Sequence, residues 1–222
     1  MTHAFRTALR DRRLYLITDA SPRLGLLALI ESAVQGGVDM VQLREKRLDD
    51  GELLAAGREA ARLCRRLGVP FIVNDRADIA RAAGADGVHL GQDDLPVEEA
   101  RALIGPDAFI GLSTHSPEQV DAALDVDYIG IGPIHETPTK PGRPAVGTQL
   151  VRYAADHAVQ PFFAIGGLEP SNVGDVVRAG ARNISVLRYV ANAGDPRRAA
   201  HEMIEAIDRA LATEHASGRS TV

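Results

Sequence analysis

Three acidic residues stand at or just beyond the ends of two short apolar runs that are separated by one segment of helix length. Asp75 follows the run Phe71–Asn74, and Asp93 and Asp94 follow the run Val88–Leu90. If both runs are strands of a parallel sheet, their carboxyl ends lie at one edge, about 4.8 Å apart. Carboxylates gathered there suit Mg²⁺, which commonly accompanies a phosphorylated substrate. The alternative is that Asp75 or Asp94 caps the next helix, a role that does not exclude metal binding.

Three long polar side chains stand at the end of another apolar run. Side chains alternate along a strand, so Gln42, Arg44 and Lys46 share one face. Arginine forks onto phosphate oxygens, and lysine acts as a movable point charge. The face therefore predicts a pyrophosphate site. The alternative is a solvated strand end whose charges pair with Asp49 and Asp50.

Two later segments have the composition of substrate-binding loops. The segment 132–143 is long and rich in hydroxyls and cations, and Thr137, Thr139 and Lys140 suit an anionic substrate. A solvent-exposed loop is the alternative there. The glycines at 166–167 follow a further apolar run, where bare backbone lets a phosphate approach amide groups.

The histidines do not have the spacing of a zinc motif. No pair among His89, His115 and His135 is four residues apart on a helix. We expect His89 to be a hydrogen-bonded interior residue and His115 to be structural in its loop. The sequence also lacks a nucleophile elbow, a P-loop and a dinucleotide fingerprint.

Eight apolar runs alternate with segments of helical periodicity, such as 51–67 and 171–179. This alternation predicts right-handed strand–helix–strand units around a parallel sheet. The expected strands are Leu14–Thr18, Met40–Leu43, Phe71–Asn74, Val88–Leu90, Phe109–Ser113, Tyr128–Gly132, Phe162–Ile165 and Ile184–Leu187.

A weak repeat supports the count of eight strands. Three full copies have a glycine, an alanine or valine, a polar residue and a new apolar run, with the polar positions at Asp39, Asp86 and Arg182, and a looser copy at 125–129 has Asp125 in place of the glycine and Asp127 at the polar position. Each interval accommodates two strand–helix units, so the copies introduce every second strand. We therefore predict the α/β class and a single (β/α)₈ TIM barrel, with active residues at the carboxyl ends of strands.

Length and composition limit the class of protein. The chain has 222 residues, of which 45% are hydrophobic and 4% aromatic, and its net charge of −5 argues against a general nucleic-acid binder. Its only cysteine, Cys64, excludes an internal disulfide. Residues 1–13 do not resemble a secretory signal, and no apolar run approaches the ~20 residues that cross a membrane.

From these limits we expect one cytoplasmic domain over 1–222, with no nucleic-acid or membrane partner. The barrel is expected to cover about 13–211. A short polar extension precedes it and a frayed tail follows Leu211. The sequence leaves the oligomeric state open, a homo-oligomer included.

Together these motifs resemble the thiamine phosphate synthase family. The resemblance runs from Leu14 to the end of the eighth strand, with its motifs in order at strand ends. They are Gln42–Lys46, Asn74–Asp75, Gly91–Asp94, Ser113–His115, Thr137–Lys140 and Ile165–Gly167.

The resemblance implies a transferase that joins 4-amino-2-methyl-5-hydroxymethylpyrimidine diphosphate to a thiazole phosphate, or to its carboxylated tautomer. The products are thiamine monophosphate and pyrophosphate, and the substitution is dissociative. By resemblance, the pyrimidine diphosphate is held by Gln42, Arg44, Lys46, Asn74, Ser113 and Lys140, with Arg44, Lys46, Ser113 and Lys140 acting in catalysis. Asp75 and Asp94 bind Mg²⁺, and the thiazole phosphate is held by Thr137, Thr139, Gly167, Leu187 and Arg188.

This chain departs from the family pattern in one place. Leu187 and Arg188 stand where the family often has a small serine-type residue, so Arg188 adds charge to the expected phosphate site. The rival interpretations are the related thiazole tautomerase, which generally lacks these acids and the threonine–lysine loop, and another phosphate-binding barrel that uses Asp75 as a base. A third is a non-catalytic barrel that senses thiamine intermediates.

Overall fold

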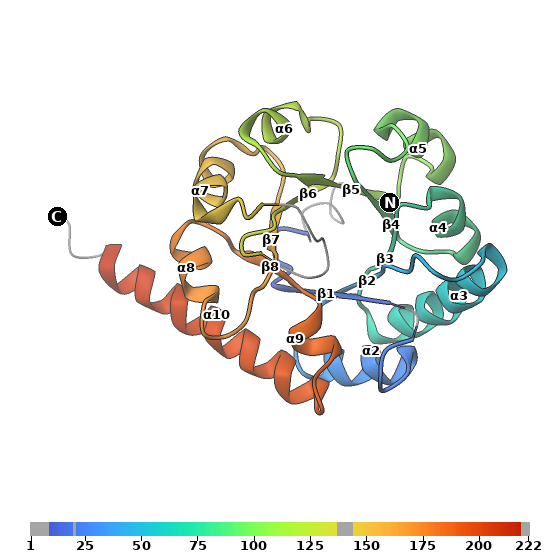
Figure 1. Cartoon of the computed structure of the whole chain (residues 1–222), viewed down its shortest axis with the longest axis horizontal. Helices are drawn as coiled ribbons and strands as arrows, with labels where there is room; N and C mark the ends of the chain where they lie inside the picture. Colours follow the sequence, from blue (N-terminus) through green and yellow to red (C-terminus); the bar gives the residue numbers. More distant parts are fainter. Residues whose placement is uncertain (1–8, 20, 137–143, 219–222) are drawn as a thin grey trace.

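Eight parallel strands close into a barrel in chain order, which confirms the prediction of a (β/α)₈ fold. The computed structural model describes residues 9–19, 21–136 and 144–218. A helix follows each strand, and the helices surround the ring of strands (Figure 1). The strands are β1 Leu14–Thr18, β2 Met40–Leu43, β3 Phe71–Asn74, β4 Gly87–Leu90, β5 Phe109–Thr114, β6 Tyr128–Ile131, β7 Phe162–Ile165 and β8 Asn183–Val186. The helices are α2 Leu26–Gln35, α3 Asp50–Leu67, α4 Ala77–Ala83, α5 Val97–Ile104, α6 Pro117–Ala122, α7 Gly147–His157, α8 Val173–Arg178, α9 Arg188–Ala191 and α10 Pro196–Gly218.

Four strands, β1, β2, β3 and β7, have the bounds that the sequence predicts. The other four differ by one residue at one or both ends, which is the usual uncertainty of an element boundary. Helix α8 is shorter than the predicted segment 171–179. The tail that the sequence predicts to be frayed after Leu211 is helical as far as Gly218, in keeping with the alanine and glutamate that follow.

Alternate residues of each strand face the barrel interior or the surrounding helices. The interior layer consists of seven buried residues, among them Tyr15, Phe109, Tyr128 and Phe163, which are four of the nine tyrosines and phenylalanines in the chain. Leu9 joins this layer, so the segment before β1 closes the amino end of the barrel. Aromatic rings thus make up more than half of the interior layer.

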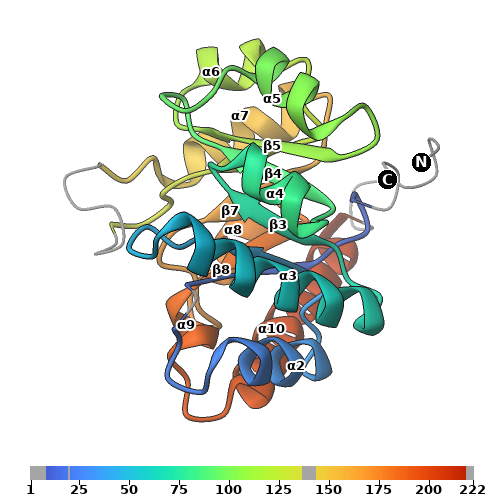
Figure 2. The same cartoon turned by 90° about the vertical axis from the view of Figure 1, so that its right-hand side faces the viewer.

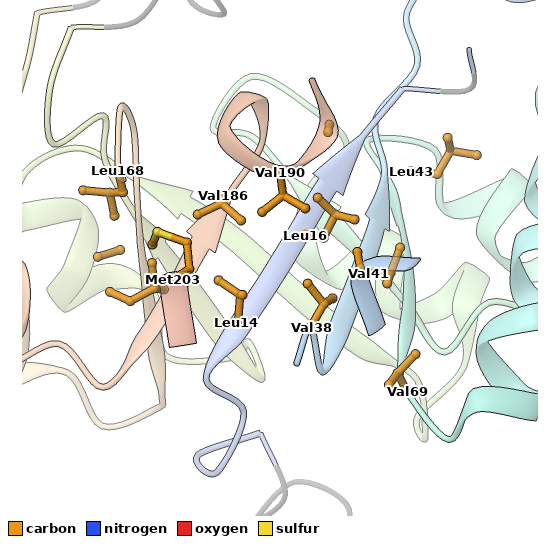
Figure 3. Packing of buried hydrophobic residues seen from close by; sticks show 14 of the residues in the cluster. Leu14, Leu16, Val38, Val41, Leu43, Val69, Leu168, Val186, Val190 and Met203 are labelled. Carbon is orange, nitrogen blue, oxygen red and sulfur yellow. The ribbon is translucent and has the colours of Figure 1, made fainter. Parts of the chain in front are cut away.

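The outward residues of the strands form a second, larger apolar layer against the helices. Figure 3 shows this layer around β1, β2 and β8, where Leu14 and Leu16 of β1 lie among side chains such as Val41 and Val186. Val190 of α9 and Met203 of α10 cover it from outside. Because both faces of every strand are buried, the strands have continuous apolar runs, as expected for a parallel sheet.

The last helix, α10, closes the ring of helices by packing on α2, which follows β1, and on α8, which follows β7. Figure 2 shows α10 beside α2 below the barrel. None of the helices in the described part of the chain has the length and apolarity needed to cross a membrane.

The acids of the sequence repeat connect strands at the amino end of the barrel. Asp39 accepts hydrogen bonds from the backbone N–H groups of Arg13 and Leu14, at 2.7 and 3.1 Å. Asp86 accepts one from Phe71 and Asp127 one from Ile110, each at 2.9 Å. Each acid therefore stands directly before an even-numbered strand and accepts a hydrogen bond near the start of the odd-numbered strand that precedes it in the chain. The spacing alone does not reveal this role.

We expect Asp86→Ala to lower the free energy of unfolding by about 1–3 kcal/mol, because it leaves the N–H of fully buried Phe71 without its acceptor. Urea unfolding would show a lower midpoint with an unchanged slope. Asp125→Ala, at an exposed position in the looser copy of the repeat, is the matched control. Equal effects of the two variants would contradict the capping role.

Candidate active site

A cavity of about 340 Å³ lies inside the barrel and among the loops at the carboxyl ends of the strands. Seven of the predicted site residues line it, and they come from β2, β3, β5 and the segments after β2, β7 and β8. They are Gln42, Arg44, Asn74, Ser113, Gly167, Leu187 and Arg188. These side chains therefore meet at the carboxyl ends of the strands, which is the location that the barrel fold predicts for active residues.

The floor of the cavity is aromatic. The rings of Tyr15, Tyr128 and Phe163 meet edge to face, with centroids 5.2 to 6.0 Å apart. Such pairs contribute about 0.5–1.5 kcal/mol each beyond their buried area. Gly111 makes room for this floor, because a Cβ there would collide with the Tyr128 ring. A ring-shaped ligand is therefore offered a rigid, apolar surface.

Arg44 places a positive charge in the wall of the cavity. Its backbone N–H donates to Thr18 at 2.7 Å, which ties the β2 end to β1. Its guanidinium forms no ion pair with any other described residue. The alternative partners have other roles: Asp49 caps α3 through the Glu52 N–H, and Asp50 binds Arg76. The guanidinium is thus available for an anionic ligand.

Gln42 faces inward from β2 and is 1% exposed. Its Nε2 donates a hydrogen bond of 2.5 Å to the Tyr15 hydroxyl, so the amide lies between the aromatic floor and the cavity. Lys46 lies beyond the end of β2, where its Nζ is 3.3 Å from Oδ2 of Asp75. Gln42 and Arg44 therefore meet in the cavity, whereas Lys46 joins the acidic residues beside it.

Asp75 and Asp94 come together, as the two strand ends predict. The two carboxyl groups are in contact, and burial followed by the neighbouring Asp94 raises the pKa of Asp75 above its usual value. Oδ2 of Asp94 accepts a 2.6 Å hydrogen bond from the Gly91 N–H, which fixes the turn after β4. Within the described ranges no group of three His, Cys, Asp or Glu side chains is arranged to hold a metal.

The backbone of Asp75 is in the left-handed region, with φ at 64°, which is uncommon for a residue other than glycine. Its N–H donates to the carbonyl of His89 on the neighbouring strand at 2.8 Å. The next residue, Arg76, forks onto Asp50 and Asp78 at 2.5 to 3.0 Å and holds the following turn. The Asp75 carboxylate is thus aimed by its surroundings, at some cost in strain.

The alternative role of these acids as helix caps is wrong. Helix α4 begins after Arg76 and helix α5 after Pro96, and neither helix has a side-chain cap. The only hydrogen bond from a described backbone N–H to Asp94 is the one from Gly91. Both carboxylates are therefore committed to the strand ends and not to the helices that follow.

The glycine pair after β7 lies against the loop after β6. Gly166 has φ at 113°, and a Cβ there would lie 2.6 Å from Cα of Pro133 and 2.7 Å from the nitrogen of Ile134. Glycine is therefore required at 166 for packing. Gly167 lines the cavity, its carbonyl accepts from Asn172 at 2.9 Å, and no described residue accepts from its N–H.

At the end of β8, Leu187 and Arg188 line the cavity, and Arg188 begins the short helix α9. The Arg188 side chain is exposed and forms no ion pair with another described residue. Three further predicted residues, Thr137, Thr139 and Lys140, lie outside the described residues.

The residues of the cavity floor are not among the predicted site residues. Tyr15, Tyr128 and Phe163 carry no motif and were part of the predicted strands only. His89 is hydrogen-bonded inside the barrel, as expected, and it also lines the cavity. The alternation of side chains along a strand could have identified such a residue, because it places Tyr15 on the same side of β1 as Ile17, which also lines the cavity.

The comparisons with known proteins agree with this geometry. Residues 14–190 match the family model described as thiamine monophosphate synthase. The chain is 52% identical to the thiamine-phosphate synthase of Acidothermus cellulolyticus over 89% of this chain and 95% of that one. It is 44% identical to the thiamine-phosphate synthase of Thermosynechococcus vestitus over 90% of its own length, which spans 57% of that longer protein.

Among solved structures, the chain is similar to a thiamine phosphate pyrophosphorylase from Pyrococcus furiosus. The TM-score is 0.82 at 31% identity, covering 93% of this chain and 99% of the other. The family model covers well over half of the chain, and the Acidothermus relative matches along nearly its whole length. The chain therefore belongs to the thiamine monophosphate synthase family.

Proposed function

We propose that this chain joins 4-amino-2-methyl-5-hydroxymethylpyrimidine diphosphate to 4-methyl-5-(2-phosphoethyl)thiazole, or to its carboxylated tautomer. The products are thiamine monophosphate and pyrophosphate, and the carboxylated tautomer in addition loses its carboxyl group as carbon dioxide. The observation that carries the proposal is a cavity whose two arginines, Arg44 and Arg188, form no ion pair with another described residue in a chain of this family. Two anionic substrates require such separate positive groups in one cavity.

The pyrimidine diphosphate is assigned to the side of the cavity formed by β2 to β5. Arg44 and Asn74 line that side and face the diphosphate, with Lys46 at its edge. Gln42, which is buried, and Ser113 also line the cavity and are assigned to the pyrimidine ring. Lys140 is assigned to the diphosphate by family resemblance. These groups neutralise the charge of the leaving pyrophosphate, which is where a dissociative reaction needs help.

Mg²⁺ fits the pair Asp75 and Asp94. Two carboxylates in contact repel each other when both are ionised, and a hard cation between them removes that repulsion. Mg²⁺ usually takes one or two carboxylates and completes its shell with water and substrate phosphates, so a third protein ligand is not required. When bound, the ion would supply positive charge to the diphosphate.

The chain's own residues then position and protect the reaction. The bond between the pyrimidine methylene and the diphosphate oxygen breaks, and the oxygen keeps the electron pair. The aminopyrimidine stabilises the methylene cation that remains. The thiazole nitrogen donates its lone pair to that carbon and forms the new bond. The aromatic floor of Tyr15, Tyr128 and Phe163 excludes water that would otherwise capture the cation.

The thiazole phosphate is assigned to the segments after β7 and β8. The Gly167 N–H and the Arg188 guanidinium are its donors there, and Leu187 contacts the apolar part. Thr137 and Thr139 are assigned to the same phosphate by family resemblance. This arrangement holds the nucleophile opposite the leaving group, which is most of what such a substitution needs from a protein.

The decisive experiment mixes both substrates with the protein and follows thiamine monophosphate and pyrophosphate, with and without Mg²⁺. We expect equal amounts of both products and a requirement for a divalent cation. Absence of product with Mg²⁺ and with every other divalent metal would refute the synthase. Isomerisation of the carboxylated thiazole phosphate alone would instead support the tautomerase.

We expect Arg188→Ala to raise KM for the thiazole phosphate about tenfold and to leave KM for the pyrimidine diphosphate nearly unchanged, because one charge-assisted hydrogen bond is lost. Initial rates with each substrate varied in turn measure this. Arg178→Ala, an exposed arginine on α8 outside the cavity, is the control. An equal rise in both KM values would show that Arg188 does not belong to the thiazole side.

A further inference from the structure

A chain of hydrogen bonds crosses the barrel interior beneath the cavity. The Gln42 amide nitrogen donates to the Tyr15 hydroxyl at 2.5 Å, and the Tyr15 and Tyr128 hydroxyls are 3.0 Å apart. Tyr128 then contacts Nδ1 of His89 at 3.2 Å, and Nε2 of His89 contacts the Ser113 hydroxyl at 3.0 Å. These five residues come from β2, β1, β6, β4 and β5, and we call them the relay.

Both tyrosine hydroxyls of the relay keep their protons. Burial raises the pKa of Tyr15, and burial together with Tyr15 raises the pKa of Tyr128. Each phenol is fully buried, and a protonated phenol has a single proton, so each donates one hydrogen bond within the relay. The donors must then follow one another in a single direction.

The direction follows from the Gln42 amide. Since Nε2 of Gln42 donates to Tyr15, the Tyr15 proton points to Tyr128, and the Tyr128 proton points to Nδ1 of His89. In a neutral imidazole, an Nδ1 that accepts a hydrogen bond leaves the single ring proton on Nε2, and Nε2 lies 3.0 Å from the Ser113 hydroxyl, to which it then donates. The Ser113 hydroxyl accepts this bond, and its own proton is then available to the cavity that Ser113 lines.

We propose that Tyr15 and Tyr128 are positioning residues that hold His89 in its Nε2–H tautomer, and that His89 thereby makes Ser113 a hydrogen-bond donor to the ligand. The ligand group facing Ser113 is then an acceptor, such as an unprotonated ring nitrogen of a pyrimidine. This last step rests on the proposed function, whereas the tautomer of His89 does not.

The tautomer is measured on the unliganded protein. Long-range ¹H–¹⁵N correlation spectra of ¹⁵N-labelled protein separate the two imidazole nitrogens by their shifts, and His89→Gln identifies the His89 signals among those of seven histidines. We expect the Nε2–H tautomer in the wild type. In Tyr128→Phe, which keeps the ring but removes the hydroxyl, we expect a mixture of tautomers.

The matched control is Tyr153→Phe, which removes a tyrosine hydroxyl from the exposed face of α7, where it binds Asp121. Its His89 spectrum should equal that of the wild type. An Nδ1–H tautomer in the wild type, or an unchanged tautomer in both Tyr128→Phe and Tyr15→Phe, would overturn the proposal. These results do not depend on turnover, so they stay informative if no thiamine monophosphate is formed.

A double-mutant cycle tests whether the relay acts through Ser113. We expect Tyr128→Phe to raise KM for the pyrimidine diphosphate about five- to tenfold, the equivalent of one hydrogen bond, with a smaller change in kcat. In a Ser113→Ala background the same substitution should have little further effect. Additive effects would mean that Tyr128 supports only the packing of the floor, and the positioning role would be abandoned.

Discussion

Replacing Asp75 with asparagine is expected to lower kcat for thiamine monophosphate synthesis by on the order of 100-fold or more. The substitution removes one of the two carboxylates proposed to bind Mg²⁺ while keeping the shape of the side chain. Asparagine also accepts the left-handed backbone that Asp75 has at φ 64°, so the turn after β3 is preserved. Initial rates at several Mg²⁺ concentrations measure the loss, and saturation should require more metal.

The stability of the same variant should not fall. Burial and the neighbouring Asp94 raise the pKa of Asp75, so the ionised carboxylate is unfavourable in the folded protein without a cation. Urea unfolding without Mg²⁺ should therefore give an equal or higher free energy for Asp75→Asn. Asp93→Asn, at an exposed neighbouring position, is the control for charge alone. Loss of folding with no change in metal dependence would show that Asp75 is structural.

The strands were predictable because each buries both faces. A continuous apolar run such as Leu14–Thr18 or Phe162–Ile165 has few other interpretations when runs and helical segments alternate. The repeat also identified the even strands correctly, since Gly84 ends α4 in the left-handed conformation and β4 follows. The repeat could not reveal the role of its acids. Asp86, for example, accepts a hydrogen bond from the start of β3, a strand that lies one whole helix earlier in the chain.

The candidate site was predictable where it depends on strand ends alone. Arg44, Asn74 and Ser113 stand at such ends, and a parallel barrel brings all its carboxyl ends together. The relay was not predictable, because the contact between Tyr15 and Tyr128 joins residues 113 positions apart and depends on the register of every strand between them. The same holds for the strained turn at Asp75, whose φ angle no local pattern specifies.

Replacing Arg44 with methionine is expected to lower kcat/KM for the pyrimidine diphosphate by about 100-fold. Methionine keeps an unbranched chain and removes only the charge and the donors. The loss should be large because the Arg44 guanidinium lines the cavity without an ion pair to another described residue, so no neighbouring acid weakens its hold on a phosphate. Rates with the diphosphate varied, and direct titration with inorganic pyrophosphate, measure the effect on turnover and on binding.

Arg47→Met is the matched control, because Arg47 follows the same strand but is exposed and binds Glu45 and Asp19. Arg44→Lys should recover only part of the activity, since lysine restores the charge without the two-pronged geometry of the guanidinium. If all three variants bound pyrophosphate like the wild type, the leaving group would lie elsewhere in the cavity. If only Arg44→Met and Arg44→Lys bind it weakly, the charge at the end of β2 holds the diphosphate, and the acids after β3 and β4 lie beside it to share a metal ion.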